Sequence, residues 1–250
     1  MQDTIDALLN LAHDIGREDR RLTILAEGNV SASVSQTEFA VKASGCSLAT
    51  LKPTDITTCD GKQILKLLER KTITDGEIET ALLESRTRPG QRKPSTETVF
   101  HAWLLTLDNV QFVAHCHPTA VNQVMCSPRA RDFAERRLFP DEVVCCGPAS
   151  VFVPYTDPGI PLARELRERT NLFIQNHKIM PRLIALQNHG IIALGATPES
   201  VLSCLLMAAK AAEVFVGSAA LGGPNFMLPK DIERIHSRPD ELYRQQQLKI

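Results

Sequence analysis

Two histidines at the end of an apolar segment have the spacing of a metal-binding pair. His115 and His117 follow residues 110–114, an apolar and β-branched run that is typical of a strand. Side chains alternate along a strand at about 3.3 Å per residue, so the two imidazoles share one face and Cys116 takes the other. The imidazoles can therefore converge on one ion. A pair of solvated histidines at a strand end is the alternative interpretation.

Two distant residues could complete a metal-binding set. His189 lies in the bend 187–190 between two apolar segments, where a titratable side chain needs a partner such as a metal ion. Glu97 lies in the first turn of a predicted helix, a position that the helix dipole by itself favours for a carboxylate. Three imidazole nitrogens and one carboxylate oxygen suit zinc or a similar divalent ion. His101, one turn after Glu97, is either a rival ligand or a buried supporting residue.

Two turns built from small residues could face an anion. Gly28-Asn29 allows a positive φ and leaves backbone N–H groups free, and Ser44-Gly45 forms a second such turn after a strand. Each turn by itself is better explained as an ordinary hairpin connection. The basic segment 86–93 is expected to be a mobile loop, whose charges either contact a phosphate or are simply solvated.

The composition is that of an ordinary globular protein. The chain has 250 residues, 43% of them hydrophobic and 23% charged, which is enough for one large α/β domain or two small ones. The net charge of −1 gives no electrostatic case for binding nucleic acid or an anionic membrane. An aromatic content of 5% also argues against a base-stacking surface.

The cysteines and the N-terminal residues favour the cytoplasm. The seven cysteines are odd in number and include no Cys-x-x-Cys spacing, which predicts buried free thiols in a reducing compartment. Residues 1–6 include two acidic residues and lack the apolar core of a signal peptide. No apolar run approaches the roughly 20 residues that span a bilayer.

The hydrophobic pattern predicts one domain with helices on both sides of a largely antiparallel sheet. Its core is expected over residues 5–222, followed by a tail, 223–250, that forms a surface or subunit-contact helix. Helices are expected over residues 3–20, 75–83, 95–106, 119–126, 129–137, 162–176 and 197–221, with a helical turn at 48–51. Strands are expected over 32–34, 38–42, 110–114, 151–153, 183–186 and 191–194, and residues 138–146 are expected to lead into the short strand 151–153. Turns are expected at 60–62 and 155–159.

Five motifs occur in one order along the chain: Gly28-Asn29-Val30-Ser31, Ser44-Gly45, Pro94-Ser95-Thr96-Glu97, His115-Cys116-His117 and Asn188-His189-Gly190. In this order and approximate spacing they resemble the class II aldolase/adducin family over roughly residues 5–222. The resemblance implies a single three-layer αβα domain of the α/β class with a mostly antiparallel central sheet. It also implies a homotetramer with sites at subunit boundaries.

The resemblance implies a role for each matching residue. His115, His117 and His189 match the zinc ligands, and Glu97 matches the glutamate that is the fourth ligand or the catalytic acid/base. The residues that match the phosphate-binding turns are Gly28, Asn29, Ser44, Gly45, Ser95 and Thr96. Aldolases of the family often use a tyrosine from a neighbouring subunit; here the stretch 153–159 offers Tyr155, which does not align with it. Residues 57–93 are longer than in compact members.

The implied activity is that of a zinc-dependent aldehyde-lyase. Such an enzyme cleaves a phosphorylated sugar through a metal-stabilised enediolate, with Mn²⁺ or Co²⁺ as alternative ions. An epimerase, dehydratase or decarboxylase would use the same site. A further alternative is an adducin-like interaction domain that binds no metal. The sequence of such a domain is expected to lack at least one of the metal ligands. All four candidate ligands are present here.

Overall fold

Seven strands form one sheet in the computed structural model, which describes residues 1–249. The strand order is β3-β2-β1-β4-β7-β6-β5, and only the β5–β6 pair is parallel among the ladders of the described residues. The strands are β1 (Asn29–Ser33), β2 (Glu38–Lys42), β3 (Ile56–Asp60), β4 (Phe112–Cys116), β5 (Val151–Val153), β6 (Leu183–Leu186) and β7 (Gly190–Gly195). The predicted mostly antiparallel sheet is confirmed.

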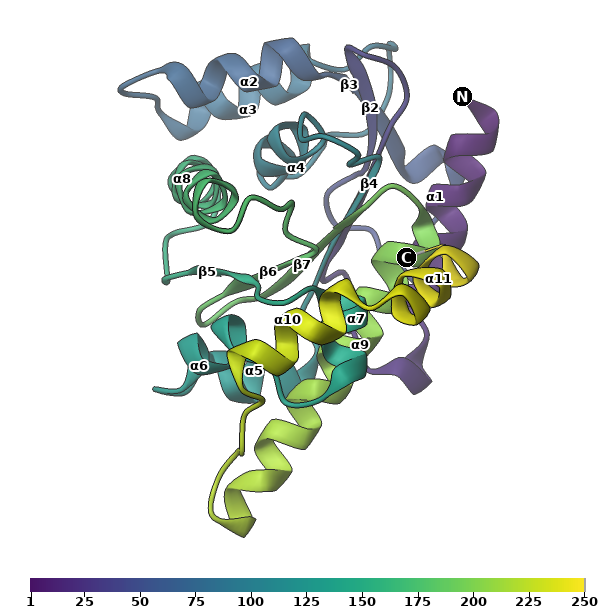
Figure 1. Ribbon diagram of the computed structural model, residues 1–250. Helices are drawn as coiled ribbons and strands as arrows, with labels where there is room; N and C mark the ends of the chain where they lie inside the picture. The colour runs from purple at the N-terminus through teal and green to yellow at the C-terminus, as the bar shows by residue number, and fades with distance from the viewer. Residues whose placement is uncertain (250) are drawn as a thin grey trace.

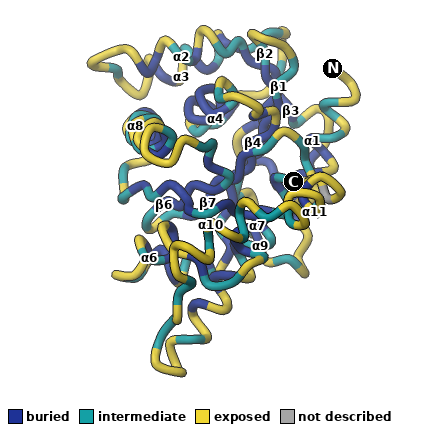
Figure 2. The backbone as a smooth tube through the Cα atoms, in the orientation of Figure 1, coloured by how far each residue is buried: buried dark blue, intermediate teal, exposed yellow. Residues whose placement is uncertain are grey.

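Helices cover both faces of this sheet and give the expected three layers (Figure 1). One face is covered by α2 (Gly61–Glu69), α3 (Asp75–Glu84), α4 (Thr98–Leu104) and α8 (Ile160–His177). The other face is covered by α1 (Gln2–Ile15), α5 (Thr119–Met125), α6 (Ala130–Glu135), α7 (Pro140–Cys146) and α9 (Pro198–Ser218). Each helix layer buries its own apolar cluster against the sheet. The central strands are coloured mostly as buried in Figure 2.

The alternation along the central strand β4 decides which helix layer each side chain meets. Ala114 and Cys116 pack into the core beneath α1, α5 and α9, whereas Val113 packs into the core beneath α4 and α8. His115 points to the same side as Val113, because its ring meets Phe100 of α4 edge-on at 5.8 Å between centroids. The predicted opposition of His115 and Cys116 is therefore confirmed.

The long helix α9 is an integral part of the core. Together with the 3-10 turn η3 (Ala219–Leu221), it is long and apolar enough to cross a membrane, with a mean hydropathy of 1.6, which the sequence analysis did not anticipate. Its buried stripe, from Val201 to Phe215, packs against α1, α5, α7 and β7. This packing buries 33% of the most apolar 18-residue window of the helix, while Val214 and Val216 are exposed. The helix begins at the predicted cap, where Thr197 accepts from the amide of Ser200 at 3.0 Å.

Two helices form the C-terminal segment that was predicted as a tail helix. They are α10 (Pro229–Ser237) and α11 (Pro239–Leu248), and both pack on α7. A glycine in the left-handed conformation, Gly222 with φ of 99°, separates this segment from α9, as the sequence indicated.

Residues 141–146, expected only to lead into the short strand 151–153, belong to the helix α7, which was not predicted. A short apolar run such as Val143–Cys146 fits a strand or a buried helix equally well. The flanking residues decide for the helix: Pro140 occupies its first turn, and Gly147 with φ of 80° ends it. Acidic residues in the first turn, Asp141 and Glu142, add a favourable interaction with the helix dipole.

The turn predicted at residues 60–62 is also different in the structure. Asp60 ends β3, which the sequence analysis missed, and caps α2, which it also missed. The carboxylate of Asp60 accepts from the amides of Lys62 at 2.8 Å and Gln63 at 3.2 Å. An Asp-Gly pair is a common hairpin signal, but here the aspartate is a helix cap.

Other differences concern the ends of elements. The first helix ends at Ile15 rather than at residue 20, and residues 18–20 form the 3-10 turn η1. The predicted strand 32–34 is β1 and starts at Asn29, and the predicted helix 95–106 is α4 and covers only Thr98–Leu104. The helical turn predicted at 48–51 is a single turn in which the amide of Leu51 donates to the carbonyl of Leu48 at 3.5 Å, and the 3-10 turn η2 (Pro53–Asp55) follows it.

The basic segment 86–93, predicted to be mobile, is held against β3. The amide of Thr87 donates to the carbonyl of Thr58 at 2.9 Å, and the hydroxyl of Thr57 donates to the carbonyl of Arg92 at 2.7 Å. The guanidinium of Arg92 pairs with Asp55 at 2.7 Å. Some of the polar groups of segment 86–93 are therefore already paired with other residues of the protein.

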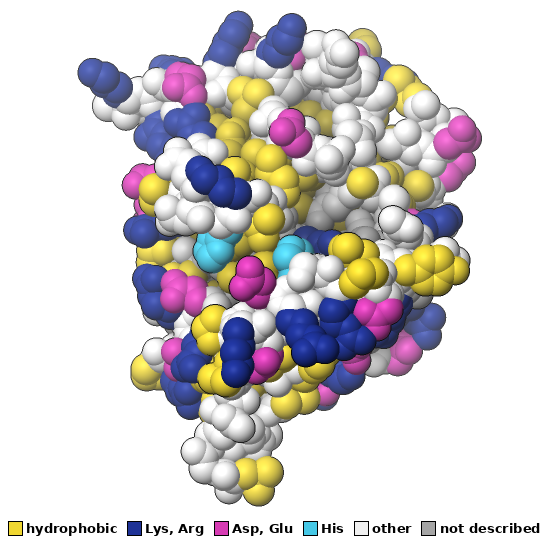
Figure 3. Space-filling view, viewed as in Figure 1, with side chains coloured by type: hydrophobic (Ala, Val, Ile, Leu, Met, Phe, Trp, Pro, Cys, Tyr) yellow, Lys and Arg dark blue, Asp and Glu magenta, His cyan; other side chains and the backbone are white. Residues whose placement is uncertain are grey.

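The seven cysteines are all free, as predicted, and only Cys126 is exposed. Burial raises the pKa of the Cys116 thiol well above its ordinary value and that of Cys59 to about 11, so both are neutral thiols. Acidic and basic side chains are interspersed on the face seen in Figure 3. This mixture agrees with the small net charge of −1.

Candidate metal centre

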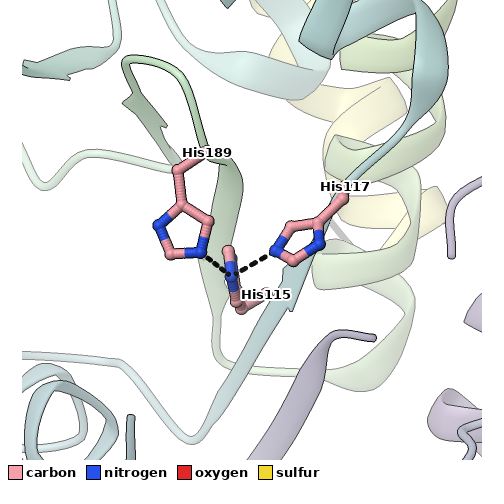
Figure 4. Close-up of side chains that lie close together, drawn as sticks. All are labelled: His115, His117 and His189. Carbon is pink, nitrogen blue, oxygen red and sulfur yellow. Dashed lines mark hydrogen bonds between the residues drawn. The ribbon is translucent and has the colours of Figure 1, made fainter. Parts of the chain in front are cut away.

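Three histidines, one at the end of the central strand β4 and two in loops, meet at one end of the sheet. The rings of His117 and His189 approach that of His115 from two sides (Figure 4). The Nε2 atom of His115 lies 2.9 Å from Nε2 of His117 and 3.3 Å from Nε2 of His189. All three ligand nitrogens lie within 4.8 Å of one another. The predicted convergence of the three imidazoles is therefore present in the structure.

Glu97 completes this cluster. Its Oε1 atom lies 3.4 Å from Nε2 of His115 and 3.8 Å from Nε2 of His189. Glu97 directly precedes α4, where its amide donates to the hydroxyl of Ser95 at 3.2 Å. The side chain thus emerges at the start of the helix and reaches the same point as the three Nε2 atoms.

The donor set fits a tetrahedral divalent ion. Zinc–nitrogen bonds of about 2.0–2.1 Å place tetrahedral ligand nitrogens about 3.3 Å apart. The observed Nε2–Nε2 separations of 2.9 Å and 3.3 Å are close to that spacing, and the carboxylate oxygen lies in the same range from His115. Three neutral imidazoles and one carboxylate are ligands that zinc and similar ions accept.

The pKa values of His117 and His189 favour ligands that are neutral at pH 7. Burial, with the adjacent His115 ring, lowers the pKa of His117 to about 4 and that of His189 to about 4. Burial acts the same way on His115, but Glu97 and the carbonyl of Ile191 outweigh it and raise its pKa. Burial opposes ionisation of Glu97, yet the close His115 ring holds the pKa of this carboxyl well below its usual range. Glu97 is therefore an anion beside the three imidazoles.

His101 takes the supporting role rather than that of a rival ligand. It is fully buried in α4, and its Nδ1 atom lies 2.7 Å from the hydroxyl of Ser31 on β1. Its ring stacks on Phe100 at 4.7 Å between centroids. Burial lowers its pKa to about 3 although the charge of Glu97 acts in the opposite direction. His101 is thus a neutral core residue that joins α4 to the sheet.

Close backbone packing fixes the histidine strand from both sides. β1 and β7 flank β4, with Asn29 opposite His115 and Ile191 opposite Cys116. A Cβ atom on Gly28, which has φ of 73°, would lie 2.7 Å from the His115 carbonyl oxygen. A Cβ atom on Gly190 would lie 2.5 Å from the Cys116 carbonyl oxygen and 2.6 Å from Cδ2 of His117. Only glycine allows both neighbouring chains to approach this closely.

We expect Gly190→Ala to reduce the free energy of unfolding by about 1–3 kcal/mol, because the added methyl group overlaps the Cys116 carbonyl and the His117 ring. Urea unfolding measures this change. Gly76→Ala is the matched control: this site in α3 has open space around the Cβ position, so alanine should be neutral or stabilise by up to about 1 kcal/mol. Equal stability of Gly190→Ala and wild type would contradict the packing argument.

The bend that carries His189 has the backbone expected of its sequence. Asn188 has φ of 56°, and asparagine is one of the few non-glycine residues that tolerate this left-handed conformation. The amide of His189 donates to the carbonyl of Leu186 at 3.2 Å, which closes the bend between β6 and β7. The turn therefore holds His189 against the end of β4.

The structure brings together several of the residues predicted to bind phosphate. The amide group of Asn29 donates to the hydroxyl of Ser95 at 2.9 Å, which joins the first turn to the segment before α4. Ser44 is tied to that segment through its own amide, which donates to the carbonyl of Lys93 at 3.0 Å. Gly45 has φ of 76°, and Thr96 lies between Ser95 and Glu97. The three turns thus lie side by side next to Glu97.

Lys42 is a residue of this region that the sequence analysis missed. It is only 3% exposed, and its ammonium group donates to the carbonyls of Cys46 at 2.8 Å and Ala26 at 3.3 Å. Burial lowers its pKa, while the charge of Glu97 counteracts part of that effect. Lys42 links the two predicted phosphate-binding turns. A lysine at the end of the apolar strand Glu38–Lys42 was the available signal.

Tyr155, the tyrosine offered as partner acid, lies apart from the histidines in this chain. Its ring is 58% exposed, and its hydroxyl lies 3.3 Å from a carboxylate oxygen of Asp157. Its amide donates to the side-chain oxygen of Gln187 at 3.3 Å, two residues before His189. The described contacts therefore give Tyr155 no direct role in the cluster.

A cavity of about 890 Å³ opens beside His117. Its walls come from the segment after α1, from the start of α5 and from Ser47 and Ala49. The polar side chains of the walls are Glu18, Arg21, Thr23, Glu27, Ser47, Thr119, Asn122 and Gln123. The walls also include the apolar residues Ile24, Leu25 and Ala49. A largely apolar cavity with several polar side chains that adjoins a cluster of metal-ligating residues is a suitable place for a small substrate.

Comparison with known proteins gives a consistent result. The sequence matches the family described as "Class II Aldolase and Adducin N-terminal domain" over residues 7–216. It is 25% identical over 241 residues to "Uncharacterized oxidoreductase YuxG" of Bacillus subtilis (strain 168), which covers 91% of this chain and 32% of that protein. The chain thus spans about a third of the length of this curated relative.

Solved structures share the fold. The N-terminal class II aldolase domain of a conserved protein from Thermoplasma acidophilum has a TM-score of 0.67 and 23% identity, covering 85% of this chain and 93% of that one. An L-fuculose 1-phosphate aldolase has a TM-score of 0.68 and 18% identity, covering 94% of this chain and 95% of that one. At these identities the similarity shows the fold alone.

Proposed function

This chain belongs to the class II aldolase and adducin family, and we propose on that premise that it is a metal-dependent aldehyde-lyase that cleaves a phosphorylated sugar. The observation that carries the proposal is the convergence of His115, His117 and His189 with Glu97 at one point. We infer that the ion is zinc, with Mn²⁺ or Co²⁺ as alternatives, because the donor set is nitrogen-rich and its spacing suits tetrahedral coordination.

Each group has a distinct task in this proposal. A bound divalent ion supplies Lewis-acid polarisation of the substrate carbonyl. Glu97 is held as a carboxylate at the centre of the cluster, so it can accept a proton from the substrate carbon or hydroxyl and return it. Neutral His117 and His189 hold the ion rather than compete for that proton.

The substrate phosphate is proposed to bind at the turns beside Glu97. Free N–H groups at Gly28, Gly45 and the segment before α4 favour an anion, and the ammonium of Lys42 lies behind both turns. The rest of the sugar would extend from His117 into the adjoining cavity, where polar side chains such as Asn122 and Gln123 line the wall. The proposed assembly is a homotetramer in the cytoplasm, as expected from the family and from the reduced cysteines.

The test is metal loading followed by a screen for cleavage. The purified protein is loaded with Zn²⁺, its metal content is measured, and a panel of ketose phosphates is assayed for release of an aldehyde and a smaller phosphorylated ketone. Near-stoichiometric zinc with cleavage of one substrate is the expected result. Isomer interconversion, dehydration or loss of CO₂ without cleavage would replace the lyase by the corresponding enzyme at the same site. Failure to bind any divalent ion would overturn the proposal in favour of an adducin-like interaction domain.

A further inference from the structure

The ring of His117 has a second polar contact that lies outside the histidine cluster. Its Nε2 atom faces His115, while its Nδ1 atom lies 3.8 Å from Oε2 of Glu27. The equivalent Nδ1 atom of His115 lies 2.9 Å from the backbone carbonyl of Ile191. We propose that Glu27 is a positioning residue of the metal site, holding the His117 ring with its proton on Nδ1 so that Nε2 can bind the ion. This inference rests on the proposed function.

Geometry separates the roles of the two nearby glutamates. Glu97 approaches His115 and His189 from the Nε2 side, which is the side of the ion. Glu27 approaches His117 from the Nδ1 side and also lines the cavity. A carboxylate on the far nitrogen of a ligating histidine orients the ring and increases its basicity as a ligand. Glu27 would therefore contact a ligand of the ion rather than the ion itself.

A residue on the Nδ1 side can set the tautomer of a ligating ring. A histidine binds an ion through Nε2 only when its proton is on Nδ1. In the His115 ring, Nδ1 donates to the carbonyl of Ile191 at 2.9 Å. On the Nδ1 side of the His117 ring lies the carboxylate of Glu27, at 3.8 Å, which favours the same ligating tautomer.

The backbone holds Glu27 in register with His117. The amide of Ile24 donates to Oε2 of Glu27 at 3.2 Å, and the amide of Glu27 donates to the carbonyl of Ile24 at 3.0 Å. The amide of His117 donates to the carbonyl of Leu22 at 3.1 Å. Residues 22–27 are therefore tied to His117 at both ends, once through the backbone and once through the glutamate. Gly28, which follows, makes the close approach to His115 described above.

The test compares Glu27→Ala and Glu27→Gln with wild type in two measurements. Zinc affinity is measured by competition with a chelator, and the His117 tautomer is measured from ¹⁵N chemical shifts of the metal-free protein. We expect Glu27→Ala to weaken zinc binding by about 10- to 100-fold and to shift His117 towards the Nε2–H tautomer. For Glu27→Gln we expect a zinc affinity and a tautomer shift between those of wild type and Glu27→Ala, because the glutamine oxygen can accept from Nδ1–H but carries no negative charge. It also keeps an acceptor for the Ile24 amide, so it carries the test if the alanine variant fails to fold.

Glu18→Gln is the matched control, because Glu18 is an exposed carboxylate that lines the same cavity. We expect it to leave both measurements unchanged. Unchanged His117 spectra in both Glu27 variants would overturn the inference, whatever the zinc affinity. A wild-type protein that binds no zinc would overturn the proposed function instead, while the ¹⁵N spectra of the metal-free protein would still decide the role of Glu27.

Discussion

Replacing His189 with alanine is expected to weaken zinc binding by more than about 100-fold. Loss of a residue that only contacts a metal ligand costs up to about 100-fold, and His189 is proposed to bind the ion directly. The change removes one of three nitrogens that lie within 4.8 Å of one another. The remaining pair, His115 and His117, cannot enclose an ion without further ligands. Elemental analysis after dialysis against a weak chelator measures the effect, and activity should disappear with the metal.

The matched control for this prediction is His177→Ala. His177 is an exposed histidine at the end of α8 and stacks on Phe173 at 4.3 Å between centroids, so it shares the chemistry of the ligands without their location. Its loss should leave the metal content at the wild-type level. Retention of stoichiometric zinc by the His189 variant would show that the ion binds elsewhere.

The second large effect is expected for Glu97→Gln, which should lower kcat by about 10²–10⁴-fold. Glutamine has the size of glutamate and can keep the hydrogen bond at the start of α4, because that bond is made by the backbone amide to Ser95. It lacks the negative charge that lets Glu97 accept a proton beside His115. Steady-state kinetics with the substrate identified in the screen measures the loss.

Two comparisons make the Glu97 result specific. Metal content measured in parallel separates a catalytic loss from a loss of the ion, since Glu97 is also proposed as a ligand. Glu84→Gln, an exposed carboxylate at the end of α3, should leave kcat unchanged. A Glu97→Gln protein that retained both zinc and full activity would remove Glu97 from the proposed chemistry.

The local sequence determined the direction of side chains along a strand and the start of a helix. The alternation of β4 placed His115 opposite Cys116 because a strand has a period of two. The cap and proline at Thr197 and Pro198 started α9 where they were expected. Short apolar runs were the weak point: the helix that contains Val143–Cys146 was not predicted, because periodicity alone does not distinguish a helix from a strand over four residues.

The fold class was also accessible from the motifs. Their order along the chain resembled one family, and the three-layer arrangement and mostly antiparallel sheet that this implied are present. The segment that follows Gly45 was predicted least well. There Asp60 is a helix cap rather than a turn, and β3 and α2 were not expected at all.

Only the tertiary structure decided how the candidate site is assembled. Strand register places Asn29 opposite His115, and the bend before β7 brings His189 within 3.3 Å of it although 74 residues separate the two histidines. Lys42 and Glu27 gained their positions from the same long-range packing. Such contacts depend on how distant strands pair, and pairing is fixed by the burial of both faces of the whole sheet rather than by any local pattern.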